Sequence, residues 1–360
     1  MPRALISYFF RPDSIPLGFS CSRSLERLGW EVENFHSQVE HPLERHGAKY
    51  VNRLLRGLSG GRWSLPAGRG ISNHRYRERL LEARVARFRP DLLLVIRGNS
   101  YSREFLDRIK REYGIARLVG WWVKDPRDGA EVIEDAKSYD SYFCIHRQGD
   151  APGEPIHFLP ATAVDRELYP VAKRRDGEAL THGLVQVGGY GARRHRFLAA
   201  CKGLPLEIYG PGWRKGRRFL DPLLRAAWAG SGIWGDALVR LYHASRIVVN
   251  VTNWDPSLRT GQNLRIMDVP ATGAFLLTDE CEEVRNLFDV GSELDTFSSP
   301  EELADKARHY LANPGERETM ARRGYERTLT FPTYDDRMKE LLCLAWGKDA
   351  APPHAAMAGR

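Results

Sequence analysis

The sequence lacks several features that mark whole classes of protein. No apolar run approaches the roughly 20 residues that a membrane-spanning helix needs. The five cysteines are scattered without C-x-x-C spacing, which argues against a disulfide framework and against a zinc site. Residues 1–14 contain no small-residue cleavage site, so they predict a first strand instead of a signal peptide. Together these absences favour a cytoplasmic protein.

The chain also lacks an internal repeat of fixed period and any unusual composition. Apolar residues make up 42% of it and charged residues 28%, which is ordinary for a globular protein. With 360 residues it is too long for most single hydrophobic cores. We therefore expect two domains of about 150 residues each.

Acidic residues are scarce between residues 41 and 90. Twelve Lys and Arg residues occur there against three Glu residues, so this basic block carries +9 while the whole chain carries +8. Such a block favours an anionic partner, which can be a phosphorylated lipid, a membrane surface, a nucleic acid or an acidic glycan. A solvated basic helix face explains the same pattern equally well. Because only four aromatic residues accompany the twelve basic ones, a specific nucleic-acid surface is the weaker alternative.

The order of apolar runs and amphipathic segments indicates alternating strands and helices. In the first half it predicts strands at 4–10, 31–35, 92–96, 117–123 and 141–145, helices at 20–28 and 102–113, and a basic helix pair around a glycine-rich loop at 57–70. In the second half it predicts strands at 183–187, 206–209, 247–251 and 274–277 and helices at 192–201, 237–244, 263–271, 300–311 and 314–328. This alternation is typical of parallel sheets with right-handed crossovers.

Residues 149–172 interrupt the alternation with four prolines, which is typical of a linker. We therefore expect an N-terminal domain at 1–160, a C-terminal domain at 170–332 and a disordered tail at 348–360. The predicted fold class is α/β, with two doubly wound halves.

Ligands of open parallel sheets bind beyond the carboxyl ends of the strands, so polar residues there are site candidates. Gly188, Gly189, Tyr190 and Arg193 follow a predicted strand and open a helix. Glycines let the backbone approach a ligand, and both helix-start amides and an Arg favour phosphate. A plain tight turn is the alternative interpretation.

Two further strand ends carry candidates. Gly210 and Trp213 follow the strand at 206–209, where the indole can stack on a base or sugar, or can be held in the core by a turn. Asn250 closes the next apolar run, and an amide at that position fits sugar or phosphate oxygens.

Thr260, Gly261 and Asn263 can cap the helix that carries Arg265 and Asp268. These two charged residues are three positions apart and therefore share one helix face. Asp268 can accept ribose hydroxyls while Arg265 holds a phosphate. Alternatively, the two form a helix ion pair that contributes a few tenths of a kcal/mol.

In the first half, Asp125 comes just after a predicted strand and can act as a general base toward an acceptor hydroxyl, or belong to a routine turn with its following proline. Asp13 lies in the first strand-to-helix loop and is a second catalytic candidate. Arg97, Gly98 and Asn99 are candidates for the rim of the site, and His36 and His146 rank below Asp125. No cluster has convincing metal-ligand spacing.

Taken in order, eight segments resemble CgeB-like (spore maturation protein type) glycosyltransferases of the group-1 glycosyltransferase clan. They lie at 89–99, 121–126, 157–171, 185–198, 208–213, 245–252, 263–291 and 298–337. The most specific is NLRIMDVPATGAFLLTDECEEVRNLFDVG, at 263–291. The resemblance implies two Rossmann-like domains facing across a cleft (GT-B type), with a nucleotide-diphosphate sugar held by the second domain. It also implies that a last helix, at 333–347, returns to the first domain.

Such enzymes generally need no metal or other cofactor, because helix dipoles and basic side chains steady the departing diphosphate. This chain departs from the family pattern at three positions. Asp268 stands where the family usually has a Glu, Thr260 stands where the wider clan has an earlier Glu, and only Asp125 remains of an acidic pair before proline.

Three functions are therefore open. The first is a metal-independent glycosyltransferase acting on an acceptor hydroxyl of unknown identity, which the basic block predicts to be anionic: a lipid with peripheral membrane contact, a glycan, a protein or a nucleic acid. The second is a non-catalytic binding or assembly protein with the same fold, which Thr260 and Asp268 favour. The third is a nucleic-acid-modifying sugar transferase that uses the basic block.

Overall fold

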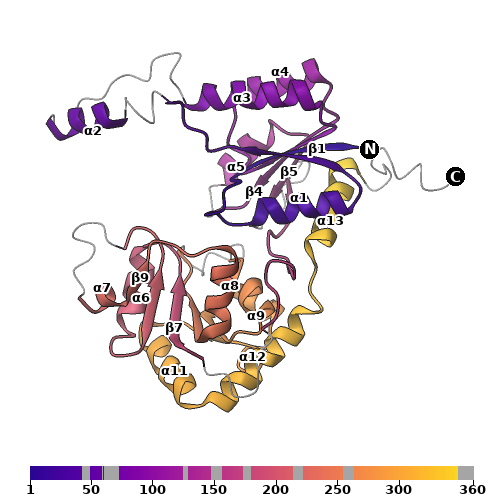
Figure 1. The fold of residues 1–360 in the computed structure, drawn as a ribbon. Helices are drawn as coiled ribbons and strands as arrows, with labels where there is room; N and C mark the ends of the chain where they lie inside the picture. Colours follow the sequence, from indigo (N-terminus) through magenta and orange to yellow (C-terminus); the bar gives the residue numbers. More distant parts are fainter. Residues whose placement is uncertain are drawn as a thin grey trace. The chain divides into compact units, whose positions relative to one another are not determined.

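Two parallel β-sheets, each covered by helices, organise the chain (Figure 1). The computed structural model describes residues 1–42, 49–58, 60, 73–124, 129–146, 156–172, 180–213, 222–253 and 263–347. The chain divides into two compact units: the first unit comprises Met1–Cys144, Gln148–Leu159 and Met338–Arg360, and the second comprises Ile145–Arg147 and Pro160–Arg337.

The first unit contains a six-stranded sheet in the order β2-β1-β3-β4-β5-β6. All of its pairs are parallel, and its strands are β1 Arg3–Tyr8, β2 Glu31–His36, β3 Leu92–Ile96, β4 Arg117–Trp122, β5 Ser141–Cys144 and β6 Ile156–Phe158. Its helices are α1 Leu17–Arg27, α2 Lys49–Leu58, α3 Asn73–Phe88, α4 Arg103–Tyr113 and α5 Gly129–Ala136. Helices α3 and α4 cover one face of this sheet and α1 covers the other (Figure 1).

The second unit has a six-stranded parallel sheet in the order β12-β11-β10-β7-β8-β9. Its strands are β7 His182–Val187, β8 Leu206–Tyr209, β9 Trp228–Gly230, β10 Ser245–Asn250, β11 Leu276–Asp279 and β12 Asp295–Phe297. Its helices are α6 Ala192–Ala199, α7 Pro222–Ala227, α8 Gly235–Ala244, α9 Arg265–Ala271, α10 Glu282–Leu287, α11 Pro300–Ala312 and α12 Pro314–Thr328. Counted along this unit, the strands follow the 3-2-1-4-5-6 order of dinucleotide-binding folds, with the direction of winding changing between β7 and β10.

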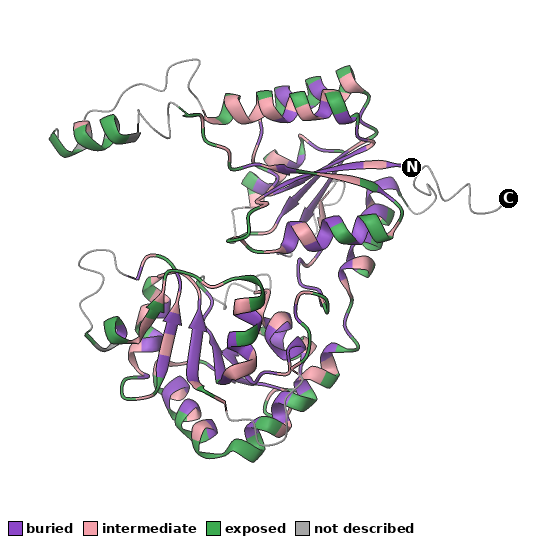
Figure 2. Cartoon of the chain, in the orientation of Figure 1, coloured by how far each residue is buried: buried purple, intermediate pink, exposed green. Residues whose placement is uncertain are grey.

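Alternating residues of the central strands build a core on each face of the second sheet. Val185 and Val248 pack with residues of α8 and α9, whereas their neighbours Leu184 and Val249 pack with residues of α6 and α11. This is the period of two that a strand buried on both faces requires. Figure 2 accordingly shows the strands of this sheet as mostly buried. The predicted α/β fold class with two parallel-sheet halves is confirmed.

The last helix, α13 Tyr334–Trp346, has contacts in both units. At its start the Tyr334 hydroxyl donates to the Ala161 carbonyl at 3.2 Å, within the second unit. At its end the Arg117 side chain donates to the Ala345 carbonyl at 3.1 Å, and Trp346 packs against Trp30, within the first unit. Among the described residues, no helix has both the length and the apolar character needed to cross a membrane.

The sequence interpretation was wrong in part of the Pro-rich stretch. Residues 156–158, expected in a linker, form edge strand β6 of the first sheet, and Val164 bridges to Thr333. Periodicity also missed the short elements α5, α7, β9, α10 and β12, because segments of three to eight residues are too short to show a period. Residues 61–70 of the glycine-rich loop and the tail at 348–360 lie outside the described residues.

Candidate functional site

The carboxyl ends of β7 and β8 lead into two glycine turns that are bonded to each other. The Gly188 amide donates to the Tyr209 carbonyl at 2.7 Å, and the Tyr190 amide donates to the Pro211 carbonyl at 2.8 Å. A Cβ on Gly210 would lie 2.1 Å from the Gly188 carbonyl oxygen, so only glycine permits this approach. The two predicted turns therefore form one unit of backbone at the carboxyl edge of the sheet.

Trp213 lies in the core beneath these turns. Its side chain has no exposed surface, and its indole nitrogen donates to the Gly188 carbonyl at 2.9 Å. This position corresponds to the core interpretation of Trp213, since a fully buried ring has no face available to a ligand. The ring of Tyr190, which is partly exposed, meets Trp213 edge to face at 5.3 Å between centroids. Tyr190 is therefore an aromatic residue at this edge that a ligand can reach.

A buried carboxylate joins the first turn of α6 to two strand ends. Asp279, at the end of β11, is 2% exposed. It accepts from Arg193 Nη1 at 2.6 Å and from the Thr252 amide and hydroxyl at 2.8 and 2.9 Å. Arg193 Nη1 also donates to the Thr252 carbonyl at 3.0 Å. A guanidinium carries five N–H groups, so this arrangement fixes Arg193 and still leaves it three further donors.

The neighbouring Arg194 has a structural role. It is buried, and it donates to the Val251 carbonyl at 2.6 Å and to the Gly189 carbonyl at 2.9 Å. The Val251 amide in turn donates to Gln186 at 3.3 Å. These bonds hold the glycine turn against the end of β10, across the position where the strand order changes direction.

A second chain of hydrogen bonds runs from the sheet to α9. Asn250 is fully buried, donates to the Thr278 hydroxyl at 2.9 Å and accepts from Asn263 at 3.2 Å. Asn263 Oδ1 accepts from the amide and from Nη1 of Arg265, at 3.1 and 3.2 Å. The buried Nε atom of Arg265 has no hydrogen-bond partner among the described residues. An unpaired buried donor costs about 1–3 kcal/mol, so its position favours an acceptor from outside the chain.

Asp268, in the first turn of α9, has an unusual carboxyl group. Burial raises its pKa from the ordinary value of 3.8 to about 8, and Arg265 and a hydrogen bond with Tyr169 reduce that rise without cancelling it. Burial also raises the pKa of Tyr169, and the Asp268 carboxylate raises it further. At neutral pH Asp268 is therefore mainly protonated, and Arg265 acts on it as a nearby positive charge.

Candidates in the first unit are less connected. Asp13 is exposed, and both of its carboxylate oxygens accept from Arg11, at 2.8 and 2.9 Å. Acting as a base would therefore require this contact to open. Arg97 has a left-handed backbone (φ 70°) and its guanidinium lies 4.4 Å from the Phe9 ring centre. Asp125, like Thr260 and Gly261 of the second unit, lies outside the described residues.

The two histidine candidates have different surroundings. His36, at the end of β2, has a buried Nδ1 atom without a partner among the described residues, and burial together with Arg11 lowers its pKa. His146 is buried just after β5. In the described part of the chain no group of three or more His, Cys, Asp or Glu side chains is arranged to hold a metal ion.

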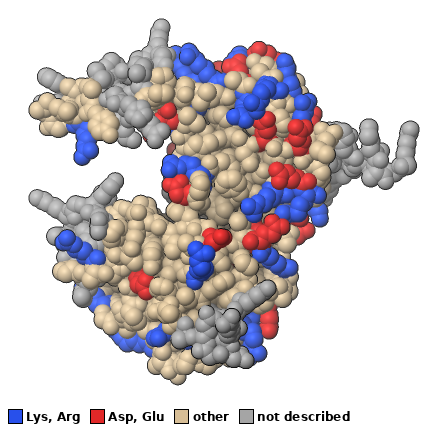
Figure 3. Space-filling view, in the orientation of Figure 1, with Lys and Arg blue, Asp and Glu red and all other residues tan. Residues whose placement is uncertain are grey.

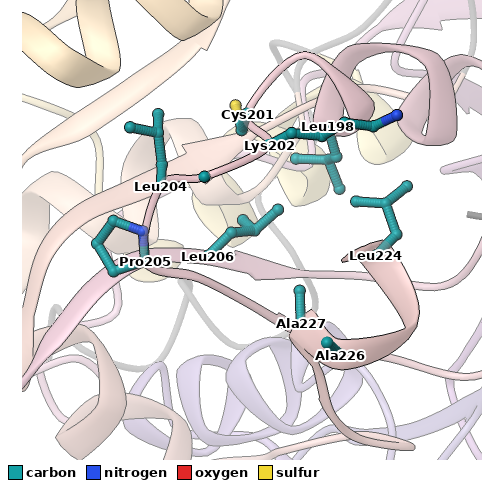
Figure 4. A pocket seen from close by; sticks show the side chains of 10 residues that line it. Leu198, Cys201, Lys202, Leu204, Pro205, Leu206, Leu224, Ala226 and Ala227 are labelled. Carbon is teal, nitrogen blue, oxygen red and sulfur yellow. The ribbon is translucent and has the colours of Figure 1, made fainter. Parts of the chain in front are cut away.

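A pocket of about 490 Å³ lies away from these residues (Figure 4). Its walls are mainly apolar and include Leu198, Leu204, Leu206 and Leu224. The pocket lies where β8 and β9 begin, because most of its lining residues, at 201–206 and 226–227, directly precede these strands or start them. Since the sheet is parallel, this is the edge opposite the glycine turns, and the pocket is not part of the candidate site.

Sequence reasoning missed several residues of this edge. Asp279 and Thr278 form the polar end of the run FLLTD and follow the same strand-end rule that selected Asn250. Gln186 and Tyr169 carried no local signal. Gln186 is the single buried polar side chain of strand β7, and Tyr169 belongs to a stretch that was interpreted as a linker.

Comparisons with known proteins give one sequence match and many structural ones. Residues 193–343 match the protein family described as "Glycosyl transferase-like". No curated protein matches the sequence. Sucrose-phosphate synthase from Thermosynechococcus elongatus is similar in structure, with a TM-score of 0.64, 15% identity and coverage of 94% of this chain and 97% of that one.

Two further structures show the same similarity. A glycosyltransferase from Rickettsia africae has a TM-score of 0.59 and 10% identity, over 95% of this chain and 97% of that one. HepE from Anabaena, solved in complex with UDP and glucose, has a TM-score of 0.60 and 11% identity, over 95% and 98%. Residues 193–343 are thus similar in sequence to glycosyl transferases, and the chain has the two-sheet α/β fold of GT-B glycosyltransferases.

Proposed function

We propose that this protein is a glycosyltransferase that moves a sugar from a nucleotide-diphosphate sugar to an acceptor hydroxyl. The observation that carries the proposal is the convergence of Arg193, Asn250, Asp279 and Arg265 through hydrogen bonds where the second sheet changes winding direction. Ligands of open α/β sheets bind at such positions. All four residues also lie within residues 193–343, the segment that matches glycosyl transferases.

In this proposal two guanidinium groups hold the diphosphate. Arg193 is fixed by a buried carboxylate and has three further N–H groups, and Arg265 has an unpaired buried Nε atom. Because both groups are held in place before binding, they can stabilise the charge that develops on the leaving diphosphate without reorganising. The backbone amides that open α6, after Gly191, add donors of the same kind.

The nucleoside would lie between Tyr190 and Asp268. Tyr190 offers a partly exposed ring for stacking, and the Asp268 carboxyl would bind ribose hydroxyls. Because burial holds the pKa of Asp268 at about 8, binding that needs the carboxylate would release a proton at pH 7. Affinity would then rise with pH, by up to about tenfold per unit below pH 8.

We propose that the transfer requires no metal, since the arginines supply the positive charge at the diphosphate. Retained turnover in a chelator would support this, and activity restored only by a divalent cation would refute it. Asp125 and Asp13 remain the proposed bases toward the acceptor, and the CgeB-like group and a cytoplasmic location remain proposals based on sequence.

The test begins with binding. Thermal unfolding is followed with nucleoside diphosphates and their sugars, starting with UDP and UDP-glucose because HepE was solved with UDP and glucose. A ligand at 100 times its Kd stabilises the folded state by about 2.7 kcal/mol, which is readily measured. Release of nucleoside diphosphate from the best donor then tests catalysis. If no nucleotide shifts the transition, the proposal is wrong.

A matched pair of variants localises the site. Arg265→Gln removes the proposed diphosphate contact, whereas Arg285→Gln changes an exposed arginine of the same unit that pairs with Glu280. We expect nucleotide affinity to fall at least about tenfold in the first variant and to stay unchanged in the second. Equal affinity in both variants would place the nucleotide elsewhere.

A non-catalytic nucleotide-sugar-binding protein is the second candidate. It is favoured by Asp268, whose short, mainly neutral carboxyl replaces the Glu of the related family. This candidate predicts stabilisation by the nucleotide sugar without release of nucleoside diphosphate. Turnover of any donor in the presence of an acceptor would exclude it.

A further inference from the structure

The helix α2 presents an apolar face to solvent. Tyr50, Val51, Leu54 and Leu58 are 65%, 44%, 64% and 78% exposed. Four of the ten exposed large hydrophobic side chains among the described residues thus lie in one ten-residue helix. Figure 2 shows α2 as exposed along its visible length.

These four residues form a single stripe. At 100° per residue, positions 50, 54, 58 and 51 fall within one face of a helix. The described side chain of Arg53 is also exposed and falls outside this stripe. Among the described elements none packs extensively against α2, so the stripe has no large cover within the chain that the structure describes.

The charge of the helix points to one kind of partner. Its sequence, KYVNRLLRGL, has three basic residues and no acidic residue, and it lies in the basic block of residues 41–90, with twelve basic and three acidic residues. In α3, Arg75 and Arg79 are exposed as well. Figure 3 shows the visible surface of α2 as mainly uncharged, with basic atoms at its lower edge.

We infer that α2 is a membrane-binding helix, which inserts its apolar stripe into the interface of an anionic lipid bilayer. Helices of this type combine an apolar face containing aromatic and leucine side chains with basic residues on the other face. A second copy of the chain fits less well, because the same excess of positive charge would meet itself across the contact. A nucleic acid would use the basic residues and leave the leucines in water.

The test measures co-sedimentation of the full-length protein with lipid vesicles. One set consists of phosphatidylcholine alone, and the other contains phosphatidylglycerol as its anionic component. We expect binding to the anionic vesicles, weaker binding to the neutral ones, and partial loss of binding at high salt. Absence of sedimentation with either set would overturn the inference.

Variants separate the apolar stripe from the charge. Leu54→Ser combined with Leu58→Ser should weaken vesicle binding at least about tenfold, because two exposed leucines no longer enter the bilayer. Arg53→Glu should weaken binding only to the anionic vesicles. Leu329→Ser, at an exposed leucine of the second unit, is the matched control and should bind normally. Thermal unfolding of each variant should remain unchanged.

Two results would exclude the proposed role. If the double leucine variant binds vesicles as well as the unaltered protein, charge alone acts and the apolar stripe is not inserted. If it binds equally but its molecular mass in solution falls, the stripe joins copies of the chain instead. Vesicle binding requires no sugar transfer, so this test is independent of the proposed enzymatic function.

Discussion

Asp268→Asn tests the central electrostatic feature of the candidate site. Burial raises the pKa of Asp268 from 3.8 to about 8, so between these values the folded state keeps a proton that the unfolded state releases. A raised pKa stabilises the folded state fully at pH below the unfolded value, and this stabilisation is lost as the pH rises through the folded value. The asparagine variant has no proton to lose at this position.

The expected size follows from proton linkage. Where only the unfolded state is ionised, each pH unit changes the free energy of unfolding by about 1.4 kcal/mol. Between pH 5 and pH 7 the stability of Asp268→Asn, relative to the unaltered protein, should therefore rise by about 2.7 kcal/mol. Loss of the Tyr169 hydrogen bond adds an offset that does not depend on pH, so the slope isolates the ionisation.

The assay is urea unfolding of both proteins at closely spaced pH values. Asp305→Asn, which removes a carboxylate whose side chain is 77% exposed, is the control for loss of charge alone. The carbon chemical shift of the Asp268 carboxyl, measured by NMR, reports the ionisation of this group directly and should change near pH 8. If the difference in free energy of unfolding between Asp268→Asn and the unaltered protein stays constant from pH 5 to pH 7, the reasoning is refuted, since Asp268 would then be ionised throughout that range.

Three more outcomes follow from the contacts at the same edge. Gly210→Ala should destabilise the protein by several kcal/mol in urea unfolding, because its methyl group would lie 2.1 Å from a carbonyl oxygen. Gly57→Ala is the control and should be neutral or slightly stabilising, because a methyl group there would meet no atom within 4 Å. Arg193→Ala should cost about 3–5 kcal/mol in the same assay by leaving a buried carboxylate unpaired. Trp213→Phe should lower the free energy of unfolding by about 1 kcal/mol and leave nucleotide affinity unchanged. Tyr190→Ala should weaken nucleotide affinity, measured by calorimetric titration. If Trp213→Phe weakens nucleotide affinity and Tyr190→Ala does not, the indole lies at the ligand.

The alternation of strands and helices was predictable because strands buried on both faces, such as LLLVI at 92–96, consist of apolar residues alone. The expectation that ligands bind at strand ends likewise selected Gly188, Arg193 and Asn250. Hydrogen bonds hold these residues at the carboxyl edge of the second sheet. These residues lie together because parallel strands bring their carboxyl ends to the same edge whatever their separation in sequence, and their role in binding stays a prediction.

What failed depended on contacts between distant residues. Packing decides whether the indole of a Trp that follows a strand faces a ligand or the core. Trp213 is enclosed by residues that are distant from it in sequence. The carboxylate that fixes Arg193 lies 86 residues away, so no local spacing could indicate it. The pKa of Asp268 depends on burial and on Tyr169, neither of which is visible in the helix sequence.

Asp268→Glu tests whether this residue limits the proposed activity. Glutamate is the residue of the resembled family, and its extra methylene would extend the carboxyl group by about 1.5 Å. A carboxyl group that this extension carries out of its buried surroundings has a pKa closer to the ordinary range. We then expect nucleotide affinity at pH 7 to rise and its dependence on pH to flatten, measured by calorimetric titration at pH 6 and pH 8. A weaker and equally pH-dependent affinity would show that the chain is built around the shorter, neutral acid, with a donor geometry unlike that of the family.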